Sequence, residues 1–284
     1  MLNVEQTWRA RIDNPRYNTS YPLNPLYWGQ YRISGSLPFT DSRCAFYFHI
    51  PFCARLCSFC EYTRMTCPAE SLQMKYLHTL ARDVERFRSG CGISHLCGFD
   101  IGGGTPTVLS DDAFSYLMEL YLKSVKGMQF CDDYEASIEG TFHSISEHKL
   151  IQTAKCGIYR LSLGVQTSVK SVLAAHNRAE LGRERLVEKM EMIRACGIRK
   201  INLDLMYGLN GQTDKSINSD METIAELAPD QVTLYEWRTN MLAVNAQSTA
   251  AKNYEAYCMY YELLKQLGYH ARFGQNTFSR SSVD

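Results

Sequence analysis

Residues 47–60 read Tyr47-Phe-His-Ile-Pro-Phe-Cys-Ala-Arg-Leu-Cys-Ser-Phe-Cys60, so Cys53, Cys57 and Cys60 have the spacing C-x3-C-x2-C. Three thiolates on one short loop fit three corners of a cubic [4Fe–4S] cluster and leave the fourth iron without a protein ligand. Ferredoxin-type clusters use four cysteines and pass electrons. An open metal position, in contrast, can bind and activate another molecule. The stretch therefore predicts a reactive cluster site.

The same cysteines also fit a zinc site or a set of buried thiols. Zinc sites usually take two pairs of ligands separated along the chain. Cys67 is the only nearby candidate for a fourth ligand, and no second pair follows it. The spacing alone favours a cluster and leaves zinc open.

Three further motifs follow in order along the chain. They are Ile101-Gly-Gly-Gly-Thr-Pro-Thr107, Arg160-Leu-Ser-Leu-Gly-Val-Gln166 and Asn202-Leu-Asp-Leu-Met-Tyr-Gly-Leu209. With these motifs the chain resembles the radical S-adenosylmethionine (SAM) enzymes, and within them the branch of the oxygen-independent coproporphyrinogen III dehydrogenase. That branch also holds haem chaperones, anaerobilin synthases, and class C methyltransferases and cyclopropanases. The resemblance extends from about Pro15 to the C-terminal end.

Apolar runs and amphipathic stretches alternate from residue 44 onward. We expect strands near 44–49, 98–101, 135–139, 159–164, 199–206 and 231–236, and helices near 69–88, 111–126, 145–156, 180–196, 214–228 and 249–267. Two helices should end at Gly157 and Gly197, because glycine tolerates the left-handed cap conformation. This alternation predicts parallel strands in right-handed βαβ units. The resemblance implies an α/β fold, a partial (β/α)6 TIM-like barrel with its site at the carboxyl ends of the strands.

The chain is expected to divide into two parts. Residues 1–40 contain Pro15, Pro22, Pro25 and Pro38, which indicates an irregular N-terminal arm. Residues 41–284 form the partial-barrel domain. By resemblance, a C-terminal accessory domain that would cover the substrate is absent from this sequence.

The resemblance implies a role for specific residues. Cys53, Cys57 and Cys60 would hold the cluster and be the catalytic ligands, and the open iron would chelate SAM for reductive cleavage to a 5′-deoxyadenosyl radical. In the family, Gln166, Arg178 and Asp204 match residues that bind a second SAM, and Phe59 also contacts it. The full set expected to contact SAM is Tyr47, Phe59, Gly103, Gly104, Thr105, Glu139, Gln166, Arg178, Asp204 and Phe273. Of the histidines, His49 is expected to support the cluster loop and His176 to be exposed.

Two departures from the porphyrinogen dehydrogenase bear on the reaction. Tyr62 stands where that enzyme has a fourth cysteine, and Asn210 stands where its Tyr-Gly-Leu-Pro turn has proline. They favour transfer of a methyl or methylene group from a second SAM to an sp2 carbon of a small molecule, by methylation or cyclopropanation. Porphyrin-directed chemistry, such as coproporphyrinogen III dehydrogenation, remains an alternative. A haem chaperone is an alternative of another class.

Composition limits the partners. The 284 residues carry 30 basic and 30 acidic side chains, which argues against nucleic acid or an anionic membrane as a partner. No run approaches the roughly 18 apolar residues of a membrane span, and the N-terminus lacks a signal peptide. We therefore expect a cytoplasmic protein whose 11 cysteines are reduced. Its expected partners are a small-molecule substrate and an electron donor such as flavodoxin or ferredoxin.

Overall fold

The computed structural model describes residues 42–60, 62–90, 93–179, 181–237, 246–271 and 276–281, with the backbone alone for 246–250. The expected N-terminal arm, residues 1–40, lies outside the described residues, as does Phe273.

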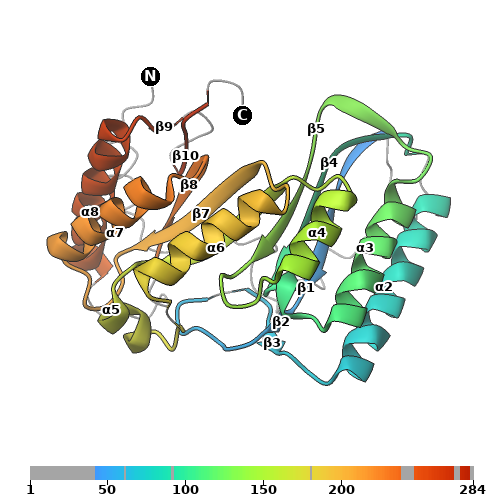
Figure 1. Cartoon of the computed structure of the whole chain (residues 1–284), viewed down its shortest axis with the longest axis horizontal. Coiled ribbons are helices and arrows are strands. Elements are labelled where there is room, and N and C mark those ends of the chain that lie inside the picture. Colours follow the sequence, from blue (N-terminus) through green and yellow to red (C-terminus); the bar gives the residue numbers. More distant parts are fainter. Residues whose placement is uncertain are drawn as a thin grey trace.

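A curved sheet of mainly parallel strands forms the body of the described chain (Figure 1). Its order is β1-β4-β5-β6-β7-β8-β10-β9, and each neighbouring pair from β1 to β8 is parallel. β10 pairs antiparallel with both β8 and β9. Six parallel strands in chain order, without closure into a full barrel, confirm the predicted partial barrel. The strands are β1 (Arg43–Ile50), β4 (His95–Gly103), β5 (Gln129–Gly140), β6 (Arg160–Gln166), β7 (Lys200–Tyr207), β8 (Gln231–Glu236), β9 (His270–Ala271) and β10 (Thr277–Ser279).

Helices connect the successive parallel strands, and one more helix follows β8; they lie along the outer face of the sheet (Figure 1). They are α2 (Glu70–Gly90), α3 (Asp111–Val125), α4 (Glu147–Lys155), α6 (Arg183–Ala195), α7 (Asp214–Leu227) and α8 (Ala246–Gln266). Gly157 and Gly197 follow α4 and α6 with positive φ of 80° and 94°, as predicted for the ends of these helices. Six short elements of the described chain were not predicted: the short helix α5 (Lys170–Ala175), the 3-10 turn η2 (Pro106–Val108), the paired β2 (Phe52–Cys53) and β3 (Met65–Thr66), and the last two strands of the sheet, β9 and β10.

The core lies between the sheet and the helices. Leu96, Phe99, Ile101, Leu161 and Ile201 are fully buried strand residues. Apolar side chains on one stripe of a helix bury themselves against such a face, which is the main source of its stability. Local caps fix where the helices begin. Ser110 accepts from the backbone of Ala113 at the start of α3, and Thr213 and Ser216 form a capping box at the start of α7.

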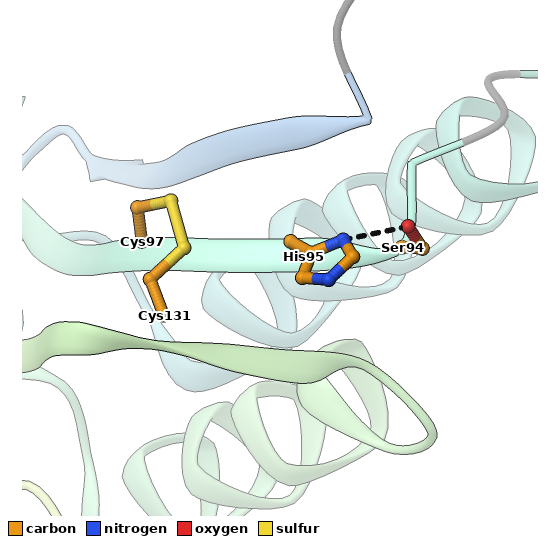
Figure 2. The surroundings of a disulfide bond; sticks show 4 residues. All are labelled: Ser94, His95, Cys97 and Cys131. Carbon is orange, nitrogen blue, oxygen red and sulfur yellow. Dashed lines mark hydrogen bonds between the residues drawn. A yellow bond between two sulfur atoms is a disulfide. The ribbon is translucent and has the colours of Figure 1, made fainter.

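Cys97 on β4 and Cys131 on β5 form a disulfide, with their Cα atoms 4.9 Å apart (Figure 2). The register between these strands shifts between Leu96 and Gly98, so Cys97 sits at an irregularity of the ladder. The expectation that every cysteine is reduced is therefore wrong for this pair. Both residues lie near the amino ends of their strands, at the end of the sheet opposite the cluster loop.

None of the described helices is long and apolar enough to cross a membrane.

Candidate functional site

The three motif cysteines lie on the loop that follows β1, and backbone pairing holds the two ends of this loop together. β2 and β3 pair Cys53 with Thr66, and the backbone N–H of Cys67 donates to the carbonyl of Cys53 at 2.8 Å. Arg64 forms a hydrogen bond across the loop: its Nη2 donates to the carbonyl of Cys57 at 2.8 Å. Cys53 and Cys57 are buried, and Cys60 is half-buried. The backbone that carries the thiols is therefore held by strand pairing and hydrogen bonds within the loop.

The thiols interact with one another. Burial raises the pKa of Cys53, and the nearby Cys60 and Cys57 raise it further, against a hydrogen bond from Thr105 that lowers it. Among the described residues, no three His, Cys, Asp or Glu side chains lie close enough to hold one metal ion. A four-iron cluster makes a different demand, because each thiolate binds a separate iron. Three thiols on one loop whose ends are paired fit that demand.

The glycine run at the end of β4 lies directly against this loop. The backbone N–H of Gly104 donates to Ile50, and that of Thr105 donates to Phe52, at 2.8 and 2.7 Å. A Cβ on Gly104 would lie 2.7 Å from the Phe52 carbonyl oxygen and 3.0 Å from the sulfur of Cys53. The Thr105 hydroxyl is 3.8 Å from the same sulfur. Only glycine permits this approach, because real Cβ contacts are longer.

Glu139, near the carboxyl end of β5, meets the glycine run from the other side. Its Oε2 accepts a hydrogen bond from the backbone N–H of Gly103 at 3.1 Å. A Cβ on Gly102 would lie 2.6 Å from its carboxyl carbon. Burial raises the pKa of Glu139, and the Gly103 hydrogen bond partly offsets this shift. The two oxygens of a carboxylate can accept several hydrogen bonds, so Glu139 can accept from more than one backbone N–H.

The three residues predicted for a second SAM converge on Gly164. Gly164 of β6 pairs with Asp204 of β7 across the parallel ladder. A Cβ on Gly164 would lie 2.6 Å from Nε2 of Gln166 and 2.9 Å from Nη2 of Arg178. Arg178 donates from Nη2 to the Gly164 carbonyl, and its Nη1 lies 3.6 Å from the sulfur of Cys57. Through Arg178, the residues predicted to bind a second SAM are therefore in contact with the cluster loop.

Gln166 has a backbone conformation that is uncommon for residues other than glycine. Its φ is 70°, at the point where the register between β6 and β7 shifts. Such conformations persist only where the surroundings fix them, and they gather at functional sites. A pocket lies beside this strand end and is lined by Gly164, Val165, Thr167, Leu173 and Arg178, with Phe142 and His143 from the loop after β5.

Asp204 takes part in a polar network on the inner face of the sheet. It accepts from Nδ2 of Asn202 at 2.7 Å and from the hydroxyl of Ser162 at 3.2 Å. Burial raises the pKa of Asp204 to about 7, and the charge of Glu139 raises it as well, against those two hydrogen bonds. The charge of Glu139 therefore disfavours the ionised form of Asp204.

The aromatic residues predicted to contact SAM lie beside the loop in different settings. Tyr47 on β1 is 54% exposed, and Phe59 is half-buried, with its ring 5.9 Å from that of His176. His49 bears out its predicted role, since its Nε2 donates to the carbonyl of Thr63 at 2.8 Å. The expectation that His176 is exposed is wrong, because only 1% of the residue is accessible.

Sequence reasoning also missed a buried carboxylate behind the site. Asp220 of α7 is 1% exposed and accepts hydrogen bonds from Thr167, Ser168 and Tyr260. Thr167 and Ser168 follow Gln166 directly, so Asp220 fixes the turn at the end of β6. Helical periodicity places Asp220 on α7 but gives no sign of the strand end that it contacts.

The fold agrees with a comparison of the chain with known proteins. The pattern of the radical SAM superfamily matches residues 47–224, and the chain belongs to that superfamily. Members of the family use a [4Fe–4S] cluster and SAM. Within it, the chain is similar to the oxygen-independent coproporphyrinogen III oxidases and to the haem chaperone HemW.

Three relatives illustrate this branch. The oxygen-independent coproporphyrinogen III oxidase of Cereibacter sphaeroides is 31% identical over 240 residues, which cover 80% of this chain and 50% of the relative. Heme chaperone HemW of Bacillus subtilis is 31% identical over 189 residues, covering 66% of this chain and 49% of the relative. The solved structure of coproporphyrinogen III oxidase (HemN) from Escherichia coli superposes with a TM-score of 0.75 at 27% identity, covering 95% of this chain and 64% of that chain. The chain thus spans about half the length of the curated relatives it matches.

Proposed function

We propose that the chain holds a [4Fe–4S] cluster on Cys53, Cys57 and Cys60 and cleaves SAM reductively. The observation that carries this proposal is the contact between the cluster loop and the glycine run, where Gly104 approaches the sulfur of Cys53. When bound, the cluster supplies one electron to the sulfonium of SAM, which yields the 5′-deoxyadenosyl radical. The protein's part is to hold SAM in one orientation and exclude water.

Glu139 is the proposed partner of the SAM ammonium group. Its carboxylate lies against Gly102 and accepts from Gly103, beside the loop that carries the cysteines. A charge-assisted hydrogen bond to a cation would stabilise the ionised carboxylate, which burial otherwise disfavours. Binding of SAM would thereby offset the desolvation of Glu139.

A cysteine substitution tests the cluster site. Cys57→Ala, expressed and reconstituted without oxygen alongside the original chain, should lose the iron, the sulfide and all SAM cleavage. Cys67→Ala is the matched control, because Cys67 lies on the same loop, where it accepts from Gln73 at 3.4 Å, and is outside the proposed ligand set. Cluster content that falls in Cys67→Ala and persists in Cys57→Ala would reject the ligand assignment.

A second SAM molecule, bound by Gln166, Arg178 and Asp204, is also proposed. Its support is the convergence of all three residues on Gly164, beside a pocket at the end of β6. In this reaction the radical removes a hydrogen atom from the methyl group of the second SAM. The resulting methylene radical adds to an sp2 carbon of a small-molecule substrate. One further electron from the electron donor then allows the carbon–sulfur bond to break, so that S-adenosylhomocysteine leaves and the product is methylated or cyclopropanated.

The stoichiometry of SAM binding tests this part. Equilibrium dialysis of the reconstituted protein without reductant should give two molecules of SAM per chain, and Asp204→Ala should give one with an unchanged cluster. A single molecule per chain in both proteins would remove the second-SAM proposal while leaving the first intact.

A second candidate substrate is a porphyrinogen. It is favoured by the relative from Cereibacter sphaeroides, which is named an oxygen-independent coproporphyrinogen III oxidase and matches 80% of this chain. Here the radical would take a hydrogen atom from the substrate itself, and the second SAM would donate no methyl group. Release of 5′-deoxyadenosine without S-adenosylhomocysteine distinguishes this outcome from methyl or methylene transfer.

A further inference from the structure

Three consecutive residues after α5 contact three consecutive residues of the cluster loop. Nδ2 of Asn177 donates to the carbonyl of Leu56 at 3.0 Å, and Nη1 of Arg178 lies 3.6 Å from the sulfur of Cys57. His176 contacts Ser58 twice. Its carbonyl accepts from the backbone N–H of Ser58 at 3.1 Å, and its Nδ1 lies 3.0 Å from the Ser58 hydroxyl. The segment 176–178 therefore holds the middle of the loop, at residues 56–58.

The other ring nitrogen of His176 contacts a different part of the fold. The backbone N–H of Asn210, in the turn after β7, points at Nε2 of His176 over 3.1 Å. A backbone N–H can only donate, so Nε2 must be the unprotonated acceptor of the ring. The single proton of the neutral imidazole is then on Nδ1, where it is donated to the hydroxyl of Ser58. Both ring nitrogens are used, and they link the cluster loop to the turn after β7.

The surroundings of His176 favour this neutral form. The residue is 1% exposed, and its ring packs against Phe59 and, at a centroid distance of 5.0 Å, Trp237. Burial lowers the pKa of His176, so the charged form is disfavoured. Apolar packing alone would need neither nitrogen, whereas the two hydrogen bonds fix the ring in one tautomer and one orientation.

We propose that His176 is a positioning residue for the cluster: a neutral imidazole that fixes Ser58, between Cys57 and Cys60, against the turn after β7. The inference rests on the proposed cluster site and assigns a role to a residue outside the cluster and SAM sets. A fixed Ser58 restricts the conformations of a loop that must present three thiolates to one rigid cube. The chain loses less conformational freedom on cluster binding when the loop is held in advance, so His176 slows loss of the cluster.

The test compares variants that keep one ring hydrogen bond with a variant that keeps neither. His176→Asn has an amide nitrogen where Nδ1 lies and can still donate to Ser58. His176→Gln has an amide oxygen that can still accept from Asn210. His176→Phe keeps a packed ring and loses both bonds, and Ser58→Ala removes the partner. His78→Phe is the control, because it deletes a histidine hydrogen bond to Tyr116 between α2 and α3, away from the loop.

The measurement is the rate at which an excess chelator removes iron from the reconstituted full chain, with iron and sulfide content determined beforehand. One hydrogen bond of ordinary strength corresponds to about a fivefold change in rate. We expect about fivefold faster loss in Ser58→Ala, His176→Gln and His176→Asn, because each breaks the link between Ser58 and Asn210 at one end, and at least that in His176→Phe. The double variant Ser58→Ala/His176→Gln should be no faster than either single one, because both remove the same bond.

Thermal unfolding of the cluster-free proteins separates positioning from general stability. The expected result is a midpoint for Ser58→Ala and His176→Asn close to that of the original chain. If His176→Phe does not fold, Ser58→Ala and His176→Gln still decide the matter. Rates of iron loss equal to that of the original chain in both would overturn the inference while leaving the cluster site standing. No cluster in the original chain would instead reject the proposed function.

Discussion

The backbone N–H of Gly103 on β4 donates to the carboxylate of Glu139 on β5 over 3.1 Å, so the glycine run and the acidic strand end form one unit. Together they place a half-buried carboxylate beside the loop that carries Cys53, and such a carboxylate can form a charge-assisted hydrogen bond with a cationic amino group.

Glu139→Gln should weaken SAM binding and leave the cluster in place. The amide keeps the packing against Gly102 but removes the charge, and a hydrogen bond to a charged group corresponds to about 10- to 100-fold in affinity. The measurement is equilibrium dialysis of SAM against the reconstituted protein. Glu135→Gln is the matched control, because Glu135 lies on the same strand and pairs with Lys200 instead. Equal SAM affinity in Glu139→Gln and the original chain would contradict the assigned role.

Gly104→Ala should prevent cluster assembly. The new methyl group would meet the Phe52 carbonyl oxygen at 2.7 Å and the Cys53 sulfur at 3.0 Å, so the cluster loop must move. Iron and sulfide content after anaerobic reconstitution measures the effect. Gly98→Ala on the same strand is the control, since its methyl group would make ordinary contacts of 3.7 Å with Ala45. A full cluster in Gly104→Ala would mean that the loop does not depend on this contact.

Binding of the second SAM should depend on pH through Asp204. Burial raises the pKa of Asp204 to about 7, and the ionised form is the one that attracts a cationic amino group. We expect the second SAM to bind more tightly at pH 8 than at pH 6, by a factor that Asp204→Asn abolishes. Dialysis at the two pH values, with the first site saturated, gives the comparison. A pH dependence that persists unchanged in Asp204→Asn would assign it to another group.

The raised pKa of Asp204 also affects the free energy of unfolding, which decreases as pH rises, whereas binding of the second SAM is strengthened. The unfolded chain has an aspartate pKa of about 3.9, so between roughly pH 4 and pH 7 the folded cluster-free protein holds a proton on Asp204 that the unfolded chain has lost. The contribution of Asp204 to the free energy of unfolding is therefore full below pH 4 and is lost as pH rises through about 7. Urea unfolding across this range should show a steeper fall for the original chain than for Asp204→Asn.

The disulfide between Cys97 and Cys131 should contribute to stability and not to the cluster. It closes a segment with a sequence separation of 34 residues, for which the chain-entropy relation gives about 3–4 kcal/mol. Replacing both cysteines with serine should lower the urea midpoint measured without reductant and leave the iron content unchanged. Alkylation and peptide mapping of the untreated protein should find both thiols protected. Two freely alkylated thiols would show that the pair is reduced under those conditions.

Much of the barrel follows from patterns that extend over whole elements. The six parallel strands lie where apolar runs predicted them, and the helices between them follow the expected amphipathic stretches. The turns after α4 and α6 were predicted because Gly157 and Gly197 supply the left-handed conformation that ends a helix. Long periodic segments carry this information within themselves.

The missed features depend on contacts between distant segments. α5 and the β2–β3 pair are too short for periodicity to reveal. The Cys97–Cys131 pair depends on the register of two strands and on the irregularity between Leu96 and Gly98, neither of which the sequence displays. His176 was expected to be exposed, whereas Phe59 and Trp237 from distant segments pack against its ring, which the local sequence does not reveal.

The proposed site residues were chosen from the family resemblance, which several of the quoted motifs carry. Gln166, Arg178 and Asp204 come from separate segments, and the resemblance groups them before any contact between them is known. Their contacts with Gly164, and that of Arg178 with the sulfur of Cys57, depend on the β6–β7 register and on the turn after α5. The sequence alone does not reveal these contacts.

Product analysis shows directly whether the chain cleaves SAM reductively at a cluster held by Cys53, Cys57 and Cys60. The full chain, reconstituted with iron and sulfide without oxygen, is given SAM and a strong reductant, and mass spectrometry counts 5′-deoxyadenosine and S-adenosylhomocysteine. The account predicts 5′-deoxyadenosine from the original chain and none from Cys57→Ala, with S-adenosylhomocysteine appearing as well when the methyl-accepting substrate is supplied. A chain that carries its full cluster, binds SAM and forms no 5′-deoxyadenosine would contradict the account and favour the haem-chaperone alternative.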